Sequence, residues 1–444
     1  MPESVVPGGE DRIGALPDDL LRRVLSFLTS RESVCTCVLA RRWRHLWKSV
    51  PVVRVMAPVP IDREGEEELW FVNSLLLLRD RAPLHEVDIR TYLDDPSAPL
   101  NVELWLRYAA SCHVRVLRVW VLRVYSRRLQ LPNVTLICQH LTVLDFAGMK
   151  FEEPTLNFSS CPMLEVLKMY DCKISAEKIL CKSLRHLTME ICRFDLYGRT
   201  RISCPSLTAL KLVDNLGWTP SLESMPLLVT ALVRFDEEWY ERQACYDHCL
   251  NGGYYGDCDD ELCPSCLCHG DDCVLLKGLC DATNLKLTSA PQAIICTRDF
   301  KWCHTFSKLK TLFLNEWCLA AAFGGLVYFL QHSPILERLT LQLRFDEQQS
   351  IDGKDESYKP REQFLVSKNL KVVETKCRKE DERIHQIVKI LVSLGVPPDL
   401  IDNQQNSVRS DCSSFEQEQF QLAYRSWFTD LSHQDRVPVP TPFV

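Results

Sequence analysis

Nine side chains that can bind a metal ion lie close together near the middle of the sequence. Residues 245–273 contain seven cysteines and two histidines. Cys263 and Cys266 have the two-residue spacing that allows both sulfurs to bind one zinc ion. The residues that would complete one or two tetrahedral sites are Cys245, His248, Cys249, Cys258, Cys268, His269 and Cys273. This pattern predicts a structural zinc knuckle that orders the segment around it.

The composition of the same segment supports a second interpretation. Residues 234–272 contain eleven Asp or Glu and only two Lys or Arg, with several glycines. Such a composition is also typical of a disordered acidic loop, in which the thiols would be free. The zinc pattern lacks a clean pair-plus-pair spacing, because only one C-x-x-C exists. A redox function is disfavoured, because no strand-to-helix pattern surrounds that motif. Stoichiometric zinc in the purified protein would distinguish the knuckle from the loop.

The sequence offers no other chemistry-bearing motif. It contains no G-x-S-x-G, no phosphate-binding loop and no H-E-x-x-H, so we expect a protein without catalytic activity. The formal net charge is −7, and the first fifty residues carry eight Lys or Arg against six Asp or Glu. This balance gives no positive field of the kind that nucleic-acid binding requires.

The absence of recognisable targeting and membrane-spanning segments predicts a soluble protein of the cytosol or nucleus. The first residues lack the basic and apolar regions of a secretory signal. The longest nearly continuous apolar run, Leu319 to Leu330, is too short to span a bilayer as a helix. We therefore expect no membrane contact, and we expect the 22 cysteines to be core thiols or metal ligands in a reducing compartment.

The N-terminal segment, residues 11–47, combines three short amphipathic helical patterns. Pro17 fits the first helical position, because the missing N–H of a proline would be unpaired there. Thr29 and Ser30 predict the cap of a second helix, and a third helix would carry Leu39 and Trp43. Fewer than forty residues cannot bury a stable core alone, so the segment should complete its core against another surface.

Two strings in this segment carry a specific resemblance. They read L-P-x-x-L-L-x-x-[IV]-L-S-x-L and V-L-x-R-R-W-R-x-L-W, and together they closely resemble the F-box of plant F-box proteins. The resemblance implies docking to a Skp-type adaptor, and through it to a cullin and a ubiquitin ligase. The residues that it implies for the F-box helices and their adaptor contacts are Leu16, Pro17, Leu20, Leu21, Val24, Leu25, Leu28, Val38, Leu39, Trp43, Leu46 and Trp47.

A repeated frame, L-x-x-L-x-L, follows the F-box. Clear copies begin at Leu141, Leu164, Leu184, Leu207, Leu309 and Leu336, and weaker copies begin at Leu84, Val114, Leu228 and Ala282. The successive steps from Leu141 to Leu207 are 23, 20 and 23 residues, which is typical of leucine-rich repeats. Each L-x-L should form a strand of a stacked parallel sheet with a concave face.

Two further features support the repeat assignment. Cys172, Cys192 and Asn215 lie where the repeat uses Cys or Asn to bond the turn backbone. Cys161-Pro162, Cys204-Pro205 and Ser333-Pro334 should end convex segments, since proline disfavours helix in the preceding residue. The exposed strand centres would be Lys168, Thr188 and Lys211, with Glu165, Arg185 and Thr208 nearby; this mixture designates no ligand.

The C-terminal part contains a strand pattern and then an amphipathic helix pattern, as expected for a cap that covers the last repeat. It loosely resembles the end domain of F-box proteins of the FBD type. Residues 415–431 could form a further amphipathic helix, with either a packed or a partner-bound role.

The predicted fold is α/β: a three-helix F-box, then a leucine-rich-repeat solenoid with parallel strands. The predicted units are the F-box at 11–50, repeats at 84–233 and 278–345, the acidic cysteine-rich insert at 234–277, the cap at 361–401, and a linker and tail at 402–444. The expected function is substrate recognition in an SCF-type (Skp–cullin–F-box) ubiquitin ligase, with a protein client on the repeats. The alternative is an adaptor-bound scaffold or small-molecule sensor that delivers no client. No cofactor is required by either, apart from the possible structural zinc.

Overall fold

The computed structural model describes residue 13 and residues 15–56, 64–92, 98–122, 129–130, 137–194, 198–235, 273–289, 295–343, 368–377 and 383–405. Within these ranges, no helix combines the length and the apolar character that crossing a membrane requires.

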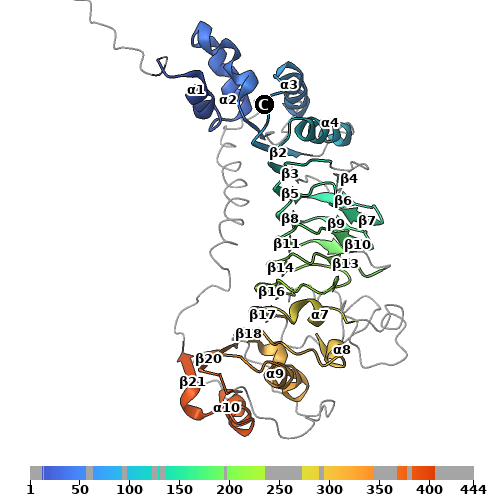
Figure 1. Cartoon of the computed structure of the whole chain (residues 1–444), viewed down its shortest axis with the longest axis vertical. Coiled ribbons are helices and arrows are strands. Elements are labelled where there is room, and N and C mark those ends of the chain that lie inside the picture. The colour runs from blue at the N-terminus through green and yellow to red at the C-terminus, as the bar shows by residue number, and fades with distance from the viewer. Residues whose placement is uncertain are drawn as a thin grey trace, which may run out of the picture.

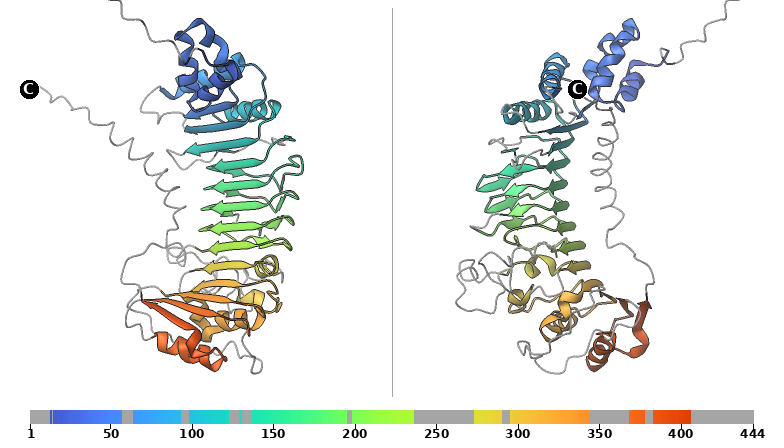
Figure 2. Two further views of the ribbon diagram at one scale, coloured as in Figure 1. Left: turned by 60° about the vertical axis from the view of Figure 1, so that its left-hand side comes forward. Right: turned by 180° about the vertical axis from the view of Figure 1, so that it is seen from behind.

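One long sheet runs through the described chain, with its strands stacked in chain order (Figures 1 and 2). Every neighbouring pair of strands in it is parallel. The strands are β1 (Val52–Met56), β2 (Glu86–Tyr92), β3 (Val116–Leu122), β5 (Val143–Ala147), β8 (Val166–Tyr170), β11 (His186–Glu190), β14 (Ala209–Val213), β16 (Thr230–Arg234), β17 (Asn284–Thr288), β18 (Thr311–Asn315), β19 (Arg338–Gln342), β20 (Val372–Cys377) and β21 (Ile401–Gln405).

The L-x-x-L-x-L frame explains ten of these strands. In each case, including the four weaker copies, the strand begins two residues after the first residue of the frame. The frame's apolar residues are buried in the core, as Leu164, just before β8, and Leu167 and Met169 of β8 are. Because side chains alternate across a strand, the intervening residues lie on the opposite face, which we call the free face.

The covered side of the sheet faces two short parallel sheets and several helices (Figure 1). One short sheet contains β7 (Thr155–Asn157), β10 (Lys178–Leu180), β13 (Arg201–Ser203) and β15 (Ser221–Leu222). The other contains β4 (Leu129–Gln130), β6 (Met149–Phe151), β9 (Lys173–Ile174) and β12 (Arg193–Phe194). The helices are α3 (Glu64–Leu78), α4 (Ala98–Ser111), α7 (Leu276–Leu279), α8 (Thr297–Phe300), η4 (Glu316–Leu319) and α9 (Ala320–His332). The core of the solenoid lies between these layers.

The predicted Cys/Asn positions form a hydrogen-bonded ladder between repeats. Cys192 donates from Sγ to the Met169 carbonyl at 3.3 Å. Asn215 donates from Nδ2 to the Met189 carbonyl at 3.0 Å and accepts the Cys192 N–H at 2.9 Å. Cys172 donates to the Phe146 carbonyl at a longer distance of 3.7 Å. Each side chain thereby satisfies backbone groups of the preceding turn, as the repeat interpretation predicts.

The predicted proline lead-ins are also present. Cys161, Cys204 and Ser333, which precede the prolines, are fully buried. Their carbonyls accept the backbone N–H of the first leucine of the next frame, at 3.0 to 3.2 Å. Each lead-in therefore turns the chain from the covered side into the next strand.

The C-terminal cap continues the sheet instead of ending it. After β20, α10 (Arg383–Ser393) buries Ile387 and Leu391 in the core, and β21 then pairs in parallel with β20. The chain turns at Gly395, whose φ of +90° suits glycine. We predicted a linker at residues 402–405, but they belong to β21. Their sequence is polar and gives no strand pattern, and the strand is held by backbone hydrogen bonds to β20.

Candidate adaptor-binding site

The F-box folds as a small unit at the N-terminal end of the sheet, above β2 in Figure 1. It contains α1 (Asp18–Leu25), α2 (Ser30–Cys35) and the 3₁₀ segments η1 (Thr36–Val38) and η2 (Arg41–Ser49). Helix α1 begins at Asp18. Pro17 is its N-cap residue, whereas the sequence predicted that Pro17 would be the first residue of the helix. The predicted third helix is a 3₁₀ segment that begins after Leu39.

Local sequence explains the start of α2. The Glu32 N–H donates to Thr29 Oγ1 at 3.3 Å, and the Thr29 N–H donates to the Glu32 carboxylate at 2.8 Å. This reciprocal pair is a capping box, which satisfies two backbone donors that a helix start leaves without partners. Arg42 of η2 then pairs with Asp18 of α1 at 2.6 Å, across the surface of the unit.

The twelve residues implied by the F-box resemblance divide into two groups. The first group forms the interior: Leu21, Leu25, Trp43 and Leu46 pack with Val50, while Leu16 and Leu28 lie partly buried against them. Trp47 is also buried, and it belongs to the core of the solenoid. These side chains build the unit and join it to the repeats.

The second group is presented to solvent. Leu20 and Val24 are exposed on α1, and Pro17 is exposed just before it. Val38 and Leu39, between η1 and η2, are 83% and 69% exposed. Phe27, in the turn just after α1, is 75% exposed, although the resemblance did not single it out. Its spacing in the sequence predicts one apolar stripe with Leu20 and Val24. We call Leu20, Val24, Phe27, Val38 and Leu39 the exposed F-box residues.

Such exposure is typical of a docking surface. Large apolar side chains that face water cost free energy, which is recovered when a partner covers them. The split also explains why the apolar stripe of α1 is wider than its own packing needs. One edge of the stripe, with Leu21 and Leu25, packs inward, and the other edge, with Leu20 and Val24, remains available.

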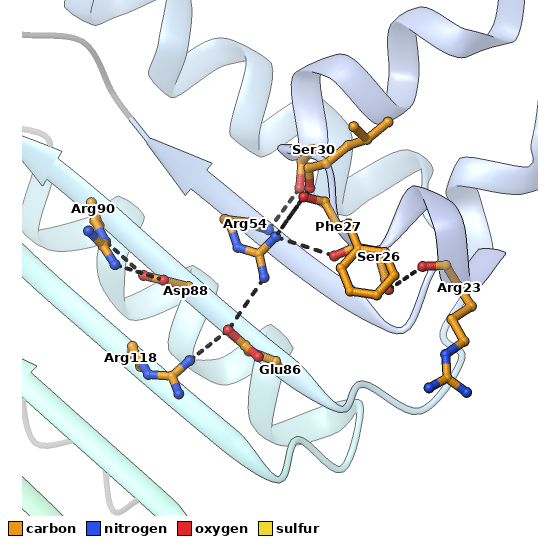
Figure 3. A network of polar contacts seen from close by, with 10 residues as sticks. Arg23, Ser26, Phe27, Ser30, Arg54, Glu86, Asp88, Arg90 and Arg118 are labelled. Atoms are coloured by element: carbon orange, nitrogen blue, oxygen red, sulfur yellow. Dashed lines mark hydrogen bonds and ion pairs between the residues drawn. The ribbon is translucent and has the colours of Figure 1, made fainter. Parts of the chain in front are cut away.

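Two arginines hold the F-box on the solenoid. Arg54 of β1 directs its guanidinium at the carbonyls of the turn just after α1, those of Ser26, Phe27 and Leu28, at 3.3 to 3.5 Å (Figure 3). The same guanidinium lies 3.7 Å from Glu86 of β2, and the Arg54 N–H donates to Ser30 Oγ at 3.0 Å. A cation at a helix C-terminus also complements the helix dipole.

The second arginine, Arg79, is buried at the end of α3. It donates to the carbonyl of Trp47 at 3.0 Å and to that of Val50. Burial lowers the pKa of its guanidinium from the usual value, with Tyr108 opposing the effect. Arg54 and Arg79 therefore satisfy carbonyls at the ends of α1 and η2, which orients the F-box relative to the repeats. Neither contact was predicted, because residues 24 to 32 positions apart carry no local signal.

The zinc prediction falls almost entirely outside the described residues. Cys245, His248, Cys249, Cys258, Cys263, Cys266, Cys268 and His269 lie there, and only Cys273 is described. Its sulfur accepts the Lys277 N–H at 3.3 Å, and burial raises the pKa of its thiol to about 12. Within the described ranges, no three His, Cys, Asp or Glu side chains form a group that could hold a metal ion. The knuckle stays a prediction.

Burial makes several thiols of the solenoid poor nucleophiles. Burial raises the pKa of the Cys161 and Cys192 thiols, and it raises that of Cys204 to about 12. The thiolate is the nucleophilic form. These cysteines therefore serve packing and the backbone ladder.

The predicted strand centres lie side by side on the free face. Lys168, Thr188 and Lys211 are direct partners in the register of β8, β11 and β14. Glu165 and Arg185, just before two of these strands, lie 3.7 Å apart.

Comparison with known protein families gives separate matches for the N-terminal unit and for the repeats. The family model for the F-box domain matches residues 13–54. A second family model, described as "FBD-associated F-box protein At5g56370, LRR repeats", matches residues 102–243. The chain thus matches an F-box model at its N-terminus and a model of FBD-associated leucine-rich repeats in its middle. The F-box match ends at Arg54. It therefore includes the exposed F-box residues and also the arginine that donates to the carbonyls just after α1.

Relatives from Arabidopsis thaliana have names of the same kind. The chain is 30% identical over 236 residues to "Putative FBD-associated F-box protein At5g56440", covering 49% of this chain and 54% of the relative. It is 30% identical over 212 residues to "F-box/FBD/LRR-repeat protein At5g56420", covering 46% of this chain and 49% of the relative. The chain therefore spans about half the length of these curated relatives. F-box domains in general bind Skp-type adaptors in SCF complexes, and F-box proteins with such repeats are typically non-catalytic adaptors.

Proposed function

We propose that this protein is a substrate-recognition subunit of an SCF-type ubiquitin ligase. The exposed F-box residues dock to a Skp-type adaptor, which connects the chain to a cullin. The repeats hold a protein client, and the protein contributes proximity and orientation but no chemical step. The observation that carries the proposal is the exposure of Val38 and Leu39 on a folded F-box whose own core is complete without them.

The hydrogen-bonded connection between the two units supports this division of labour. A receptor must hold its client at a defined position relative to the ligase, and Arg54 and Arg79 fix the F-box to the repeats. Among the described residues, the F-box and the C-terminal cap both project on the side of the free face, and the sheet lies between them (Figures 1 and 2). We propose this surface as the client site, and the cytosol or nucleus as the compartment.

The test is affinity capture of the tagged full chain from plant cells, with the adaptor and the cullin quantified by mass spectrometry. The variant Val38→Asp/Leu39→Asp should lose both proteins. The matched control is Leu77→Asp/Leu100→Asp, since Leu77 and Leu100 are exposed to a similar degree on α3 and α4. Retention of adaptor and cullin by the F-box variant, with circular dichroism unchanged, would refute the proposal.

A further inference from the structure

Helices α3 and α4 carry a second group of exposed apolar side chains, separate from the exposed F-box residues. Trp70 and Leu77 of α3 are 72% and 84% exposed. Leu78, at the end of α3, and Leu100 and Leu104 of α4 are each more than half exposed. We call these residues the α3–α4 face.

The two helices pack against each other, so these side chains belong to one surface. Asn73 of α3 accepts the indole N–H of Trp105 of α4 at 2.8 Å, and it donates from Nδ2 to Asn101 Oδ1 at 2.9 Å. Asn73 lies three residues after Trp70 and four residues before Leu77, on the same side of α3. These hydrogen bonds therefore join the exposed sides of α3 and α4.

The solenoid core does not use the α3–α4 face. Each helix buries other side chains there: Val72 and Leu75 of α3, and Val102, Trp105 and Leu106 of α4. Several large apolar side chains gathered in water are typical of a surface that another molecule covers. The α3–α4 face is therefore a candidate interface, and its charge and size indicate which molecule fits it.

The charge pattern favours a second copy of the same chain. The structure describes the side chains of residues 69–78 in α3 and 100–111 in α4. Within these two ranges, the only charged side chains are Glu103 and Arg107, which pair with each other at 2.6 Å. In a two-fold symmetric interface each patch meets its own copy, so a net charge near the axis would face an equal charge. A neutral apolar face meets this condition, and it offers a charged client nothing to pair with.

The size of the face suits a reversible dimer. α3 and α4 have 15 and 14 residues, so each is about 22 Å long and about 10 Å wide. The face thus covers about 400 Å² on each copy before its corrugation is counted, and two copies bury roughly 1,000 Å² of accessible surface, the lower limit for a specific interface. Residues 64–68, at the start of α3, include four glutamates. An antiparallel approach of the two α3 helices keeps these like charges apart.

We infer that the chain forms a symmetric dimer in which the α3–α4 faces of two copies pack against each other. In Figures 1 and 2, α3 and α4 lie on the covered side of the sheet, away from α1 and from the free face. The dimer therefore leaves the exposed F-box residues and the free face of both copies uncovered. Two linked free faces would hold a client with two matching segments more tightly than one does. This last consequence rests on the proposed function, whereas the dimer itself does not.

Size-exclusion chromatography with light scattering tests the dimer. The sample is the purified full chain with a recombinant Skp-type adaptor, loaded at about 1 to about 100 µM because dimerisation follows mass action. We expect the mass to double across this range. Leu77→Asp/Leu104→Asp should weaken dimerisation at least about a hundredfold, since it places charges in an apolar interface. The matched control is Met163→Asp/Leu227→Asp, at similarly exposed apolar residues just before the strands' leucines in the β8 and β16 repeats, and it should dimerise like wild type.

Two outcomes of this measurement would overturn the inference. The first is a wild-type complex that keeps the mass of a single chain with its adaptor at the highest concentration. The second is a Leu77→Asp/Leu104→Asp variant that dimerises like wild type, with circular dichroism unchanged. The adaptor bound per chain is quantified in the same runs. Failure to bind the adaptor, which concerns the proposed function, is thereby distinguished from failure to dimerise.

Photocrosslinking gives a second readout that does not depend on disrupting the interface. p-Benzoylphenylalanine in place of Trp70 reacts on irradiation with the molecule that lies against the α3–α4 face. In a mixture of heavy- and light-isotope chains, it should join the Trp70 peptide to α3 or α4 of the other isotope. The same label in place of Trp302, an exposed tryptophan just after α8, is the control and should give no such product. Crosslinks only within one chain, only to the adaptor, or only to a different protein in plant extract would contradict the inference.

Discussion

Arg54 and Glu86 lie 3.7 Å apart on β1 and β2, and through this pair the F-box is tied to the first repeats. The same Arg54 guanidinium reaches three carbonyls at the end of α1, while Arg118 donates to the other side of the same Glu86 oxygen at 2.6 Å. The pair thus connects a helix of the docking unit with three strands of the sheet.

Arg54→Ala should loosen this connection without unfolding the F-box core. Loss of a charged donor to several carbonyls should lower the free energy of unfolding by about 1 to 3 kcal/mol, and limited proteolysis should cut first between the F-box and β2. Urea unfolding measures the first effect. The control is Arg107→Ala, which removes an exposed i,i+4 pair with Glu103 and should cost less than about 0.5 kcal/mol. An equal loss of unfolding free energy in the two variants would show that Arg54 does not hold the F-box to the repeats.

The repeat ladder predicts a graded series at one position. Asn215→Ala removes bonds to the Met189 carbonyl and the Cys192 N–H, and should destabilise the chain by about 1 to 3 kcal/mol. Asn215→Cys should lie between Ala and wild type, because Cys192 makes the equivalent bond one repeat earlier. Chemical denaturation measures all three. If alanine matched wild type, the ladder would contribute nothing to stability.

The turn after β5 requires glycine. Gly148 has a φ of +70°, and a β-carbon there would overlap the carbonyl oxygen of Val121. Gly148→Ala should therefore cost more than about 2 kcal/mol, since strain and a backbone clash add together. Gly198→Ala is the matched control, because no atom of the described residues lies within 4 Å of a β-carbon at that position. Melting temperatures of the two variants provide the comparison, and a tolerated Gly148→Ala would contradict the described turn.

The buried Cys204 thiol should make the stability of the fold depend on pH in the alkaline range. Burial raises its pKa to about 12 from an ordinary value of 9.0. A group whose pKa is raised in the folded state stabilises the fold below its unfolded pKa, and that contribution is lost as the pH rises from about 9 toward 12. The stability difference between wild type and Cys204→Ala should therefore shrink between pH 8 and pH 11. Urea unfolding at both pH values measures it, and a constant difference would exclude the thiol as the cause.

Local pattern was sufficient for most of the solenoid, because each strand carries its own apolar frame. The strand at β1 was missed although Val50, Val53 and Val55 fit the same frame and are buried; Val50 was assigned to the F-box boundary. The strand at β21 was missed because Ile401–Gln405 is polar and depends on its neighbour for pairing. The short sheets of the covered side carry only two or three residues per strand, too few for a periodic signal.

The site was predicted only in part, for a different reason. An apolar stripe such as that of α1 shows which residues avoid water, but it does not show which edge the protein covers itself. Leu21 and Leu25 packed inward while Leu20 and Val24 remained exposed, and only the three-dimensional fold separates them. The α3–α4 face has the same limitation, because Leu77 and Leu104 are far apart in sequence and share one surface only through the packing of the two helices.

The most direct test of the central claim is a titration of the purified full chain with a recombinant Skp-type adaptor by isothermal calorimetry. Val24→Asp/Leu39→Asp should weaken binding at least about a hundredfold, since buried interface anchors are each worth about 2 kcal/mol or more. Leu77→Asp/Leu104→Asp, at exposed apolar positions of α3 and α4, should bind like wild type. Unchanged adaptor affinity in the Val24→Asp/Leu39→Asp variant would contradict the account.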